Sequence, residues 1–362
     1  MYNTSLIGRD KFEADTPALL LDIRAVESNV RKMSSFFEGR ECRLRPHCKT
    51  HKLPLIARMQ MEGGAIGITC SKIREAEVMM AAGIQSVLIA NEIVDPGKIR
   101  RLVNLTRYGE IIVCVDNFDN AAAISDCAGS AGTKMNVLVE INAGINRCGV
   151  AAGEPTVDFV RRISSLDGLV FRGLMGYEGG VFIDDPAEKE RICRESNARL
   201  VDTANMVRED GHPVEIVSAG GSNTYAQSGI YPGITEVQVG SYVTMDIHNR
   251  EFNIDFEQAV SVLATVISRP EPGRAVIDAG KKCLSTDNGL PEIMRGGTSL
   301  FALNEEHGHV RIENPSDELK VGDKLLLIPS HGCTTIPYFD DYVIVRDDII
   351  ESITEIPARQ SS

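Results

Sequence analysis

Short apolar stretches alternate with amphipathic segments along most of the first 240 residues. The short stretches have the length and the β-branched content of buried strands. The predicted strands are residues 18–22, 44–49, 65–70, 86–91, 111–116, 136–142, 171–177, 215–220 and 235–240. Between them apolar residues recur at helical spacing, as in residues 24–37, 71–82, 117–128, 157–166 and 189–210. This alternation predicts an α/β fold with a parallel (β/α)8 TIM barrel and helices outside it.

The first predicted strand is surplus, because a barrel of this kind has eight strands. After about residue 247 the pattern changes to short strands joined by turns such as residues 270–273. The strands expected there are residues 258–266, 274–278, 298–302, 309–312, 324–328 and 342–346. We therefore expect a barrel at residues 24–246. Residues 1–23 and 247–362 should form a mostly antiparallel β domain that includes the surplus strand.

Composition and charge narrow the class of protein. Hydrophobic residues make up 43% of the 362 residues and charged residues 25%, which is typical of a globular enzyme and excludes a disordered chain. The net charge of -13, without a basic cluster, argues against nucleic acid as a partner. No apolar run is long enough for a membrane, and the N-terminus lacks a signal-peptide pattern. We expect a cytoplasmic protein whose scattered cysteines are reduced.

Lys49 ends the second predicted strand, within the segment RPHCKTHK at residues 45–52. In a barrel the carboxyl ends of the strands carry the chemistry. A lysine that is desolvated at this rim loses its proton and can form an imine with a cofactor aldehyde. The period of a strand puts His47 on the same side as Lys49. A rim lysine in a salt bridge is the alternative, and the neighbouring motifs favour the cofactor.

A glycine-rich turn at residues 218–224 follows the eighth predicted strand. Backbone N–H groups and hydroxyls in such a turn can bind an anion. Barrels commonly bind phosphate after the seventh and eighth strands. The sequence therefore indicates a phosphate site, with an ordinary connecting turn as the alternative.

His331 and Cys333 form a pair two residues apart near the end of the chain. We expect an extended segment here, so both side chains would lie on one side and ligate one Zn2+. Two protein ligands leave positions open for water and substrate, as a catalytic metal requires. A packed histidine beside a buried cysteine is the alternative.

Together these segments resemble the D-threonine aldolase and eukaryotic-type D-serine dehydratase family, which belongs to the fold type III, alanine-racemase-like PLP enzymes. The resemblance covers nearly the whole chain and rests on residues 45–52, 146–150, 176–177, 220–221, 236–242, 278–280 and the final His-x-Cys pair. It implies that Lys49 carries pyridoxal 5'-phosphate (PLP) and that Arg147 and Tyr177 act beside it. The further cofactor-binding residues implied are His47, Gly220, Gly221, Ser222, Asn223, Gln238, Gly240, Ser241 and Tyr242. The implied metal ligands are His331 and Cys333.

The resemblance also implies a homodimer and a small-molecule substrate. The predicted reaction is the dehydration of a β-hydroxy D-amino acid such as D-serine, D-threonine or 3-hydroxy-D-aspartate, which gives a keto acid and ammonia. The alternative is a retro-aldol cleavage at the same site, which gives glycine and an aldehyde. A racemase would have no use for a metal pair, and a PLP carrier would lack the β domain.

Two positions bear on the choice between the reactions. The aldolase branch usually has Asp as the second metal ligand and the dehydratase branch Cys, so Cys333 favours dehydration. A thiolate also favours Zn2+ over Mn2+ or Mg2+. Glu178 stands where the family would suggest His or Gln, and its role is left open.

Overall fold

The computed structural model describes residues 4–179, 181–252, 254–314, 316 and 318–359. By residue contacts these form two compact units. The barrel unit contains residues 32–49 and 53–240, and the β unit contains residues 4–31, 50–52 and 241–359. The chain therefore leaves the barrel unit for three residues directly after Lys49 and then returns to it.

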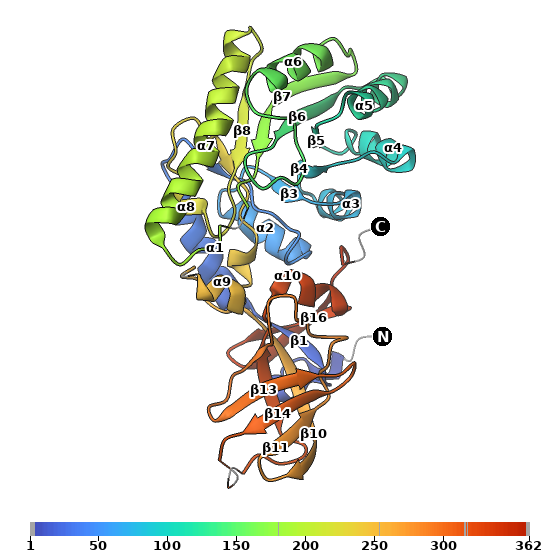
Figure 1. Ribbon diagram of the computed structural model, residues 1–362. Coiled ribbons are helices and arrows are strands. Elements are labelled where there is room, and N and C mark those ends of the chain that lie inside the picture. The colour runs from blue at the N-terminus through green and yellow to red at the C-terminus, as the bar shows by residue number, and fades with distance from the viewer. Residues whose placement is uncertain (1–3, 180, 253, 315, 317, 360–362) are drawn as a thin grey trace. The chain divides into compact units, whose positions relative to one another are not determined.

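The barrel unit is built on an eight-stranded parallel sheet with the order β2-β9-β8-β7-β6-β5-β4-β3 (Figure 1). The strands are β2 (Arg43–Leu44), β3 (Ile68–Cys70), β4 (Ser86–Glu92), β5 (Glu110–Val115), β6 (Met135–Ile141), β7 (Leu169–Gly176), β8 (Ile216–Ala219) and β9 (Glu236–Val237). A parallel bridge between His47 and Thr69 links the two ends of this order, so the sheet curls back on itself. The predicted barrel is confirmed.

Helices follow the strands and cover the outside of the sheet (Figure 1). They are α2 (Pro54–Glu62), α3 (Ile73–Ala81), α4 (Pro96–Leu105), α5 (Phe118–Ser130), α6 (Glu154–Ile163), α7 (Pro186–Glu209) and the short α8 (Tyr225–Ser228). Their starts carry local signals: Asp95 caps α4 by accepting from Lys98 N, and Pro96 occupies the first turn. Apolar side chains from five neighbouring strands form one buried cluster, namely Leu88, Ile112, Cys114, Leu138, Met175 and Ile216.

The β unit is a mixed sheet with the order β13-β14-β11-β10-β1-β16-β17, and β15 pairs with β10 and β12. Its strands are β1 (Ala18–Asp22), β10 (Val260–Glu271), β11 (Arg274–Ile277), β12 (Glu292–Ile293), β13 (Thr298–Leu303), β14 (Gly308–Ile312), β15 (Lys324–Ile328), β16 (Asp341–Arg346) and β17 (Ile349–Glu355). All pairings are antiparallel except that of β1 with β16. The surplus first strand lies in this sheet, as predicted.

The remaining helices are short, apart from α1 (Ile23–Phe37), whose residues divide between the two units. Those of the β unit are η1 (Thr4–Leu6), η2 (Lys11–Glu13), η3 (Ser241–Val243), α9 (Ile247–Glu251), α10 (Gly332–Thr335) and η4 (Ile336–Tyr338). Within the described ranges, no helix combines the length and the hydropathy that crossing a bilayer requires.

Candidate active site

Lys49 lies at the end of a buried, extended segment. The regular strand β2 stops at Leu44, five residues short of the predicted end, because Pro46 interrupts it. Pairing nevertheless continues: His47 N donates to Val239 O at 2.7 Å. Cys48 N donates to Thr69 O at 2.8 Å, so the segment is held on both sides. Lys49 follows in a turn with an exposed side chain, whereas the residues before it are buried.

A buried ion pair between Arg45 and Glu236 holds the segment that precedes Lys49. Arg45 Nε donates to Glu236 Oε2 at 2.8 Å, and both side chains are at most 4% exposed. Arg45 also donates to Ser86 Oγ at 2.9 Å. The ion pair joins the segment before Lys49 to β9, and through Ser86 to β4.

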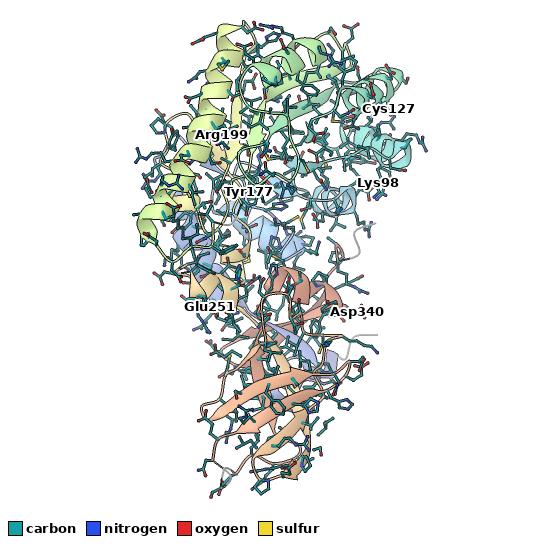
Figure 2. All side chains as sticks on the ribbon, in the orientation of Figure 1. Lys98, Cys127, Tyr177, Arg199, Glu251 and Asp340 are labelled. Carbon is teal, nitrogen blue, oxygen red and sulfur yellow. The ribbon has the colours of Figure 1, made fainter. Side chains whose placement is uncertain are left out.

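Arg147 and Tyr177, which the family resemblance implied for one site, lie together in the barrel unit, where Figure 2 labels Tyr177. The guanidinium carbon of Arg147 is 5.6 Å from the centre of the Tyr177 ring. Arg147 Nη2 also pairs with Glu140 Oε1 at 3.3 Å. Burial, together with the neighbouring Glu92, raises the pKa of Glu140 well above that of an ordinary carboxyl. Sequence reasoning missed Glu140, although an acidic residue within an apolar strand was a signal.

The glycine-rich turn after β8 brings several predicted residues together. Gly220 has φ +74°, a conformation that favours glycine. A Cβ on Gly221 would lie 3.3 Å from Tyr177 Cε2, so this position must be small for the tyrosine to approach the turn. Ser222 Oγ accepts from Gly240 N at 3.0 Å. The turn is therefore packed against both Tyr177 and the segment that follows β9.

The hydroxyl of Thr224 closes this turn. It accepts from Gly221 N at 2.9 Å and donates to the carboxyl group of Glu178. Burial raises the pKa of Glu178, and its Oε2 has no hydrogen-bond partner in the part of the chain that the structure describes. Glu178 thus contacts the turn through Thr224.

Two more predicted residues have side-chain contacts at this end of the barrel unit. Asn223 Nδ2 donates to Val181 O at 2.8 Å. Gln238 Nε2 donates to Ser218 Oγ at 2.8 Å.

Ser241 and Tyr242 contact other residues of the β unit. Ser241 Oγ donates to Asn249 Oδ1 at 3.0 Å. Tyr242 is fully buried, and its ring lies 5.4 Å from that of Phe256.

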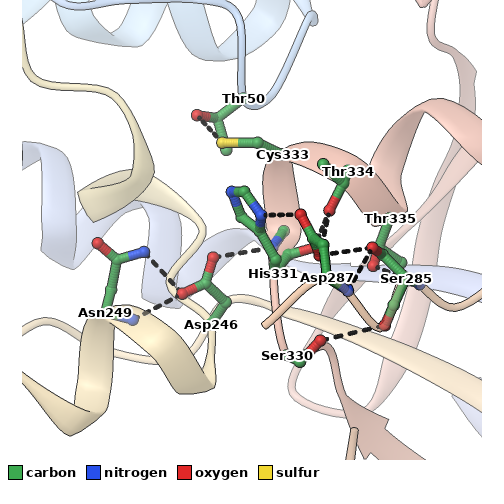
Figure 3. Close-up of polar contacts among 11 residues, drawn as sticks. Thr50, Asp246, Asn249, Ser285, Asp287, Ser330, His331, Cys333, Thr334 and Thr335 are labelled. Carbon is green, nitrogen blue, oxygen red and sulfur yellow. Dashed lines mark hydrogen bonds and ion pairs between the residues drawn. The ribbon is translucent and has the colours of Figure 1, made fainter. Parts of the chain in front are cut away.

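The His331 and Cys333 pair lies at the start of α10 in the β unit (Figure 3). The prediction of an extended segment is wrong: His331 is the N-cap of α10 and Cys333 lies in its first turn. The turn forms because Gly332 N donates to the buried carboxylate of Asp246 at 2.8 Å. Cys333 Sγ lies 3.0 Å from Thr50 Oγ1, and Thr50 directly follows Lys49 in the sequence.

Asp287 holds the imidazole of His331. Its Oδ2 lies 2.7 Å from His331 Nδ1, and its Oδ1 accepts from Ser285 Oγ at 2.6 Å (Figure 3). Burial lowers the pKa of His331, but hydrogen bonds and charge from Cys333 and Asp287 outweigh burial and raise it to about 9. A carboxylate on Nδ1 is the usual arrangement behind a metal-binding histidine and leaves Nε2 for the metal. Sequence reasoning missed Asp287 and Asp246, because no local spacing connects either residue to the pair.

Comparison with known proteins identifies the family. The family profile "Alanine racemase, N-terminal domain" matches residues 21–248, and "Putative serine dehydratase domain" matches residues 259–345. The D-threonine aldolase of Arthrobacter sp. is 38% identical over 95% of this chain and 93% of its own length. The chain belongs to the D-threonine aldolase and D-serine dehydratase family. The curated relatives of this chain are aldolases and dehydratases of the PLP-dependent fold type III family, and both are lyases, so the expectation of a lyase is confirmed.

Other members of the D-threonine aldolase and D-serine dehydratase family show both chemistries. The 3-hydroxy-D-aspartate aldolase of Paracoccus denitrificans is 36% identical over 98% of this chain and 95% of its own. The D-threo-3-hydroxyaspartate dehydratase of Delftia sp. is 30% identical over 92% of this chain and 95% of its own length. The crystal structure of D-threonine aldolase from Filomicrobium marinum superposes with a TM-score of 0.94 at 37% identity, covering 98% of each chain.

The dehydratase has also been solved as variants. One carries alanine in place of a histidine, and another carries alanine in place of a cysteine two positions later and is described as the metal-free form. The wild-type dehydratase superposes with a TM-score of 0.89 at 28% identity, covering 98% of this chain and 99% of that one.

The residues present fit the cofactor and the metal that the family implies. A lysine amine can hold an aldehyde cofactor. Gly220 and Gly221 carry no side chains that would cover the backbone of the turn, which suits a turn that binds an anion. An imidazole and a thiol on one turn are a donor set that suits Zn2+.

Proposed function

We propose that this chain is a metal-assisted, PLP-dependent lyase that cleaves a β-hydroxy D-amino acid to glycine and an aldehyde. The observation that carries the proposal is the order of identities among the relatives. Two aldolases share 38% and 36% identity with the chain over at least 95% of its length, and the dehydratase shares 30%. D-Threonine and 3-hydroxy-D-aspartate are the substrates that these relatives suggest.

In this proposal the barrel unit holds the cofactor. Lys49 carries PLP, which supplies an electron sink for negative charge at Cα of the substrate. Arg147 and Tyr177 lie beside it, and the turn from Gly220 to Asn223 binds its phosphate. The amine of Lys49 delivers the proton that Cα gains when the Cα–Cβ bond breaks.

The β unit holds the metal in this proposal. His331 and Cys333 bind Zn2+, and Asp287 keeps the imidazole oriented. A Zn2+ ion held by these residues would supply a Lewis acid for the β-hydroxyl group. In the retro-aldol cleavage a base takes the proton of that hydroxyl as the aldehyde forms, and the proton that Lys49 gives to Cα balances it.

Dehydration is the second candidate, and Cys333 is the observation that favours it. A His-x-Cys pair matches the spacing of the histidine and cysteine replaced in the dehydratase variants. In a dehydration Lys49 removes the Cα proton and the β-hydroxyl leaves, so the final products are a keto acid and ammonia.

Product analysis tests the proposal. The purified protein is incubated with D-threonine, D-serine and 3-hydroxy-D-aspartate, with and without a chelator, and glycine and ammonia are measured in parallel. Glycine with acetaldehyde from D-threonine supports the aldolase; ammonia with 2-oxobutanoate replaces it with the dehydratase.

His331→Ala should retain PLP and lose metal-dependent turnover, whereas the control His307→Ala, at an exposed histidine of the β unit, should retain both. Turnover that persists in His331→Ala would remove the metal from the mechanism.

We also propose that the protein is a homodimer, as the family resemblance implies. Sedimentation equilibrium tests this: a mass equal to one chain at assay concentration would overturn it.

A further inference from the structure

Lys189 contacts the glycine-rich turn from the first turn of α7. Its Nζ donates to Asn223 Oδ1 at 2.5 Å. The amide of Asn223 is fixed, because Nδ2 donates to Val181 O at 2.8 Å and Oδ1 is thereby directed at the lysine. Asn223 is 7% exposed and follows Ser222 in the turn proposed to bind phosphate. The ammonium is therefore held against this turn by a buried amide.

Lys189 makes no salt bridge with any carboxylate of the described residues. By contrast, Lys11 pairs with Asp348 and Lys282 with Glu306, each at 2.6 Å. Its side chain is partly buried, and burial lowers the pKa of the ammonium. A desolvated ammonium without a counter-ion is unfavourable, so an anion bound beside it would offset the cost.

The helix adds to the positive potential at this place. Asp185 is the N-cap of α7, and its carboxylate accepts from Ala187 N and Glu188 N rather than from Lys189. Lys189 is the fourth residue of α7 and so lies in its first turn, near the positive end of the helix dipole. The residues so far assigned to the phosphate offer only uncharged donors, whereas a phosphate monoester carries a charge of about -1.5 to -2 near pH 7.

We propose that Lys189 is a phosphate-binding residue, whose ammonium donates a charge-assisted hydrogen bond to the phosphate of PLP at the turn formed by residues 220–224. The inference rests on the proposed function, because it assumes that the barrel unit binds this cofactor. A lysine serves as a compact point charge for phosphate, and Asn223 fixes its position.

Cofactor titration of the apoprotein tests the role of Lys189. PLP and pyridoxal, which lacks the phosphate, are titrated into wild type, Lys189→Met and Lys189→Arg, and binding is followed by absorbance. Lys134→Met, at an exposed lysine of the barrel unit, controls for the loss of one positive charge. We expect Lys189→Met to bind PLP roughly tenfold to a hundredfold more weakly, as for the loss of a charged hydrogen bond. Its affinity for pyridoxal should be unchanged, and Lys189→Arg should restore most of the PLP affinity.

Two results would overturn the inference. One is that Lys189→Met binds PLP with the affinity of wild type. If in addition KM for the amino acid rises in this variant, the lysine binds a substrate carboxylate and not the phosphate. The other is an equal loss of PLP and pyridoxal affinity, which would indicate a folding defect and should coincide with a lower melting temperature.

Borohydride reduction and peptide mapping separate this inference from the proposed function. If wild type does not trap PLP on Lys49, the proposed function fails and the inference fails with it. If wild type traps PLP on Lys49 and Lys189→Met binds it equally well, only the inference fails.

Discussion

Removal of the Asp287 carboxylate should weaken metal binding without removing either metal ligand. The carboxylate of Asp287 forms hydrogen bonds with His331 Nδ1 at 2.7 Å, Ser285 Oγ at 2.6 Å and Thr334 Oγ1 at 3.1 Å. The first contact fixes the ring and makes Nε2 a better ligand; the other two fix the carboxylate. Loss of a carboxylate behind a metal-binding histidine typically costs tenfold to a hundredfold in metal affinity, or about 1.4 to 2.8 kcal/mol.

The two obvious substitutions at Asp287 should differ in size. Asp287→Asn keeps an oxygen that accepts from Nδ1 but loses the charge, so Zn2+ affinity should fall by roughly tenfold. Asp287→Ala also releases the ring, and the fall should approach a hundredfold. Competition with a chromophoric chelator measures both, with Glu313→Gln as a control that removes an exposed negative charge from the same unit. Zn2+ affinity in Asp287→Ala equal to that of wild type would refute the reasoning.

Three further substitutions test the barrel unit. Lys49→Ala should abolish the absorbance of bound PLP; an unchanged spectrum would mean that another group holds the cofactor. Burial and Glu92 raise the folded-state pKa of Glu140, so its stabilising contribution is present at low pH and is lost as the pH rises through that pKa. Glu140→Gln should therefore melt at a higher temperature than wild type at alkaline pH, with a smaller difference near pH 5; the opposite order would contradict the shift. Glu236→Gln leaves Arg45 buried without its charged partner, so the free energy of unfolding measured by urea denaturation should fall by about 3 to 5 kcal/mol. A fall of less than about 1 kcal/mol would show that Arg45 is solvated.

The elements that the sequence predicted well are those decided by continuous apolar runs. Each predicted barrel strand overlaps an observed one, and β1 begins and ends at the predicted residues. Such runs are buried on both faces in a parallel sheet, so their composition alone marks them. The strand before Lys49 was predicted too long because Pro46 breaks the regular ladder while the chain stays extended.

Features that depend on distant partners could not be predicted. The turn at His331 is an example: α10 is a single turn of helix, too short for a periodic pattern, and it starts where Asp246 accepts a hydrogen bond from Gly332, 86 residues later. Asp287 contacts His331 across 44 residues. Neither carboxylate differs in its local sequence from an ordinary loop acid, so only the tertiary structure reveals these contacts.

The excursion of residues 50–52 limits how this protein can be divided or recombined. The hydroxyl of Thr50 contacts Cys333, and Tyr342 Oη donates to His51 O at 3.1 Å, so these residues pack as part of the β unit although they follow Lys49 directly. A chimera that exchanged only the C-terminal segment with that of a relative would pack the relative's segment against residues 50–52 of this chain, whose side chains did not evolve with it. Successful shuffling should therefore transplant Thr50, His51 and Lys52 together with the segment that contains Cys333.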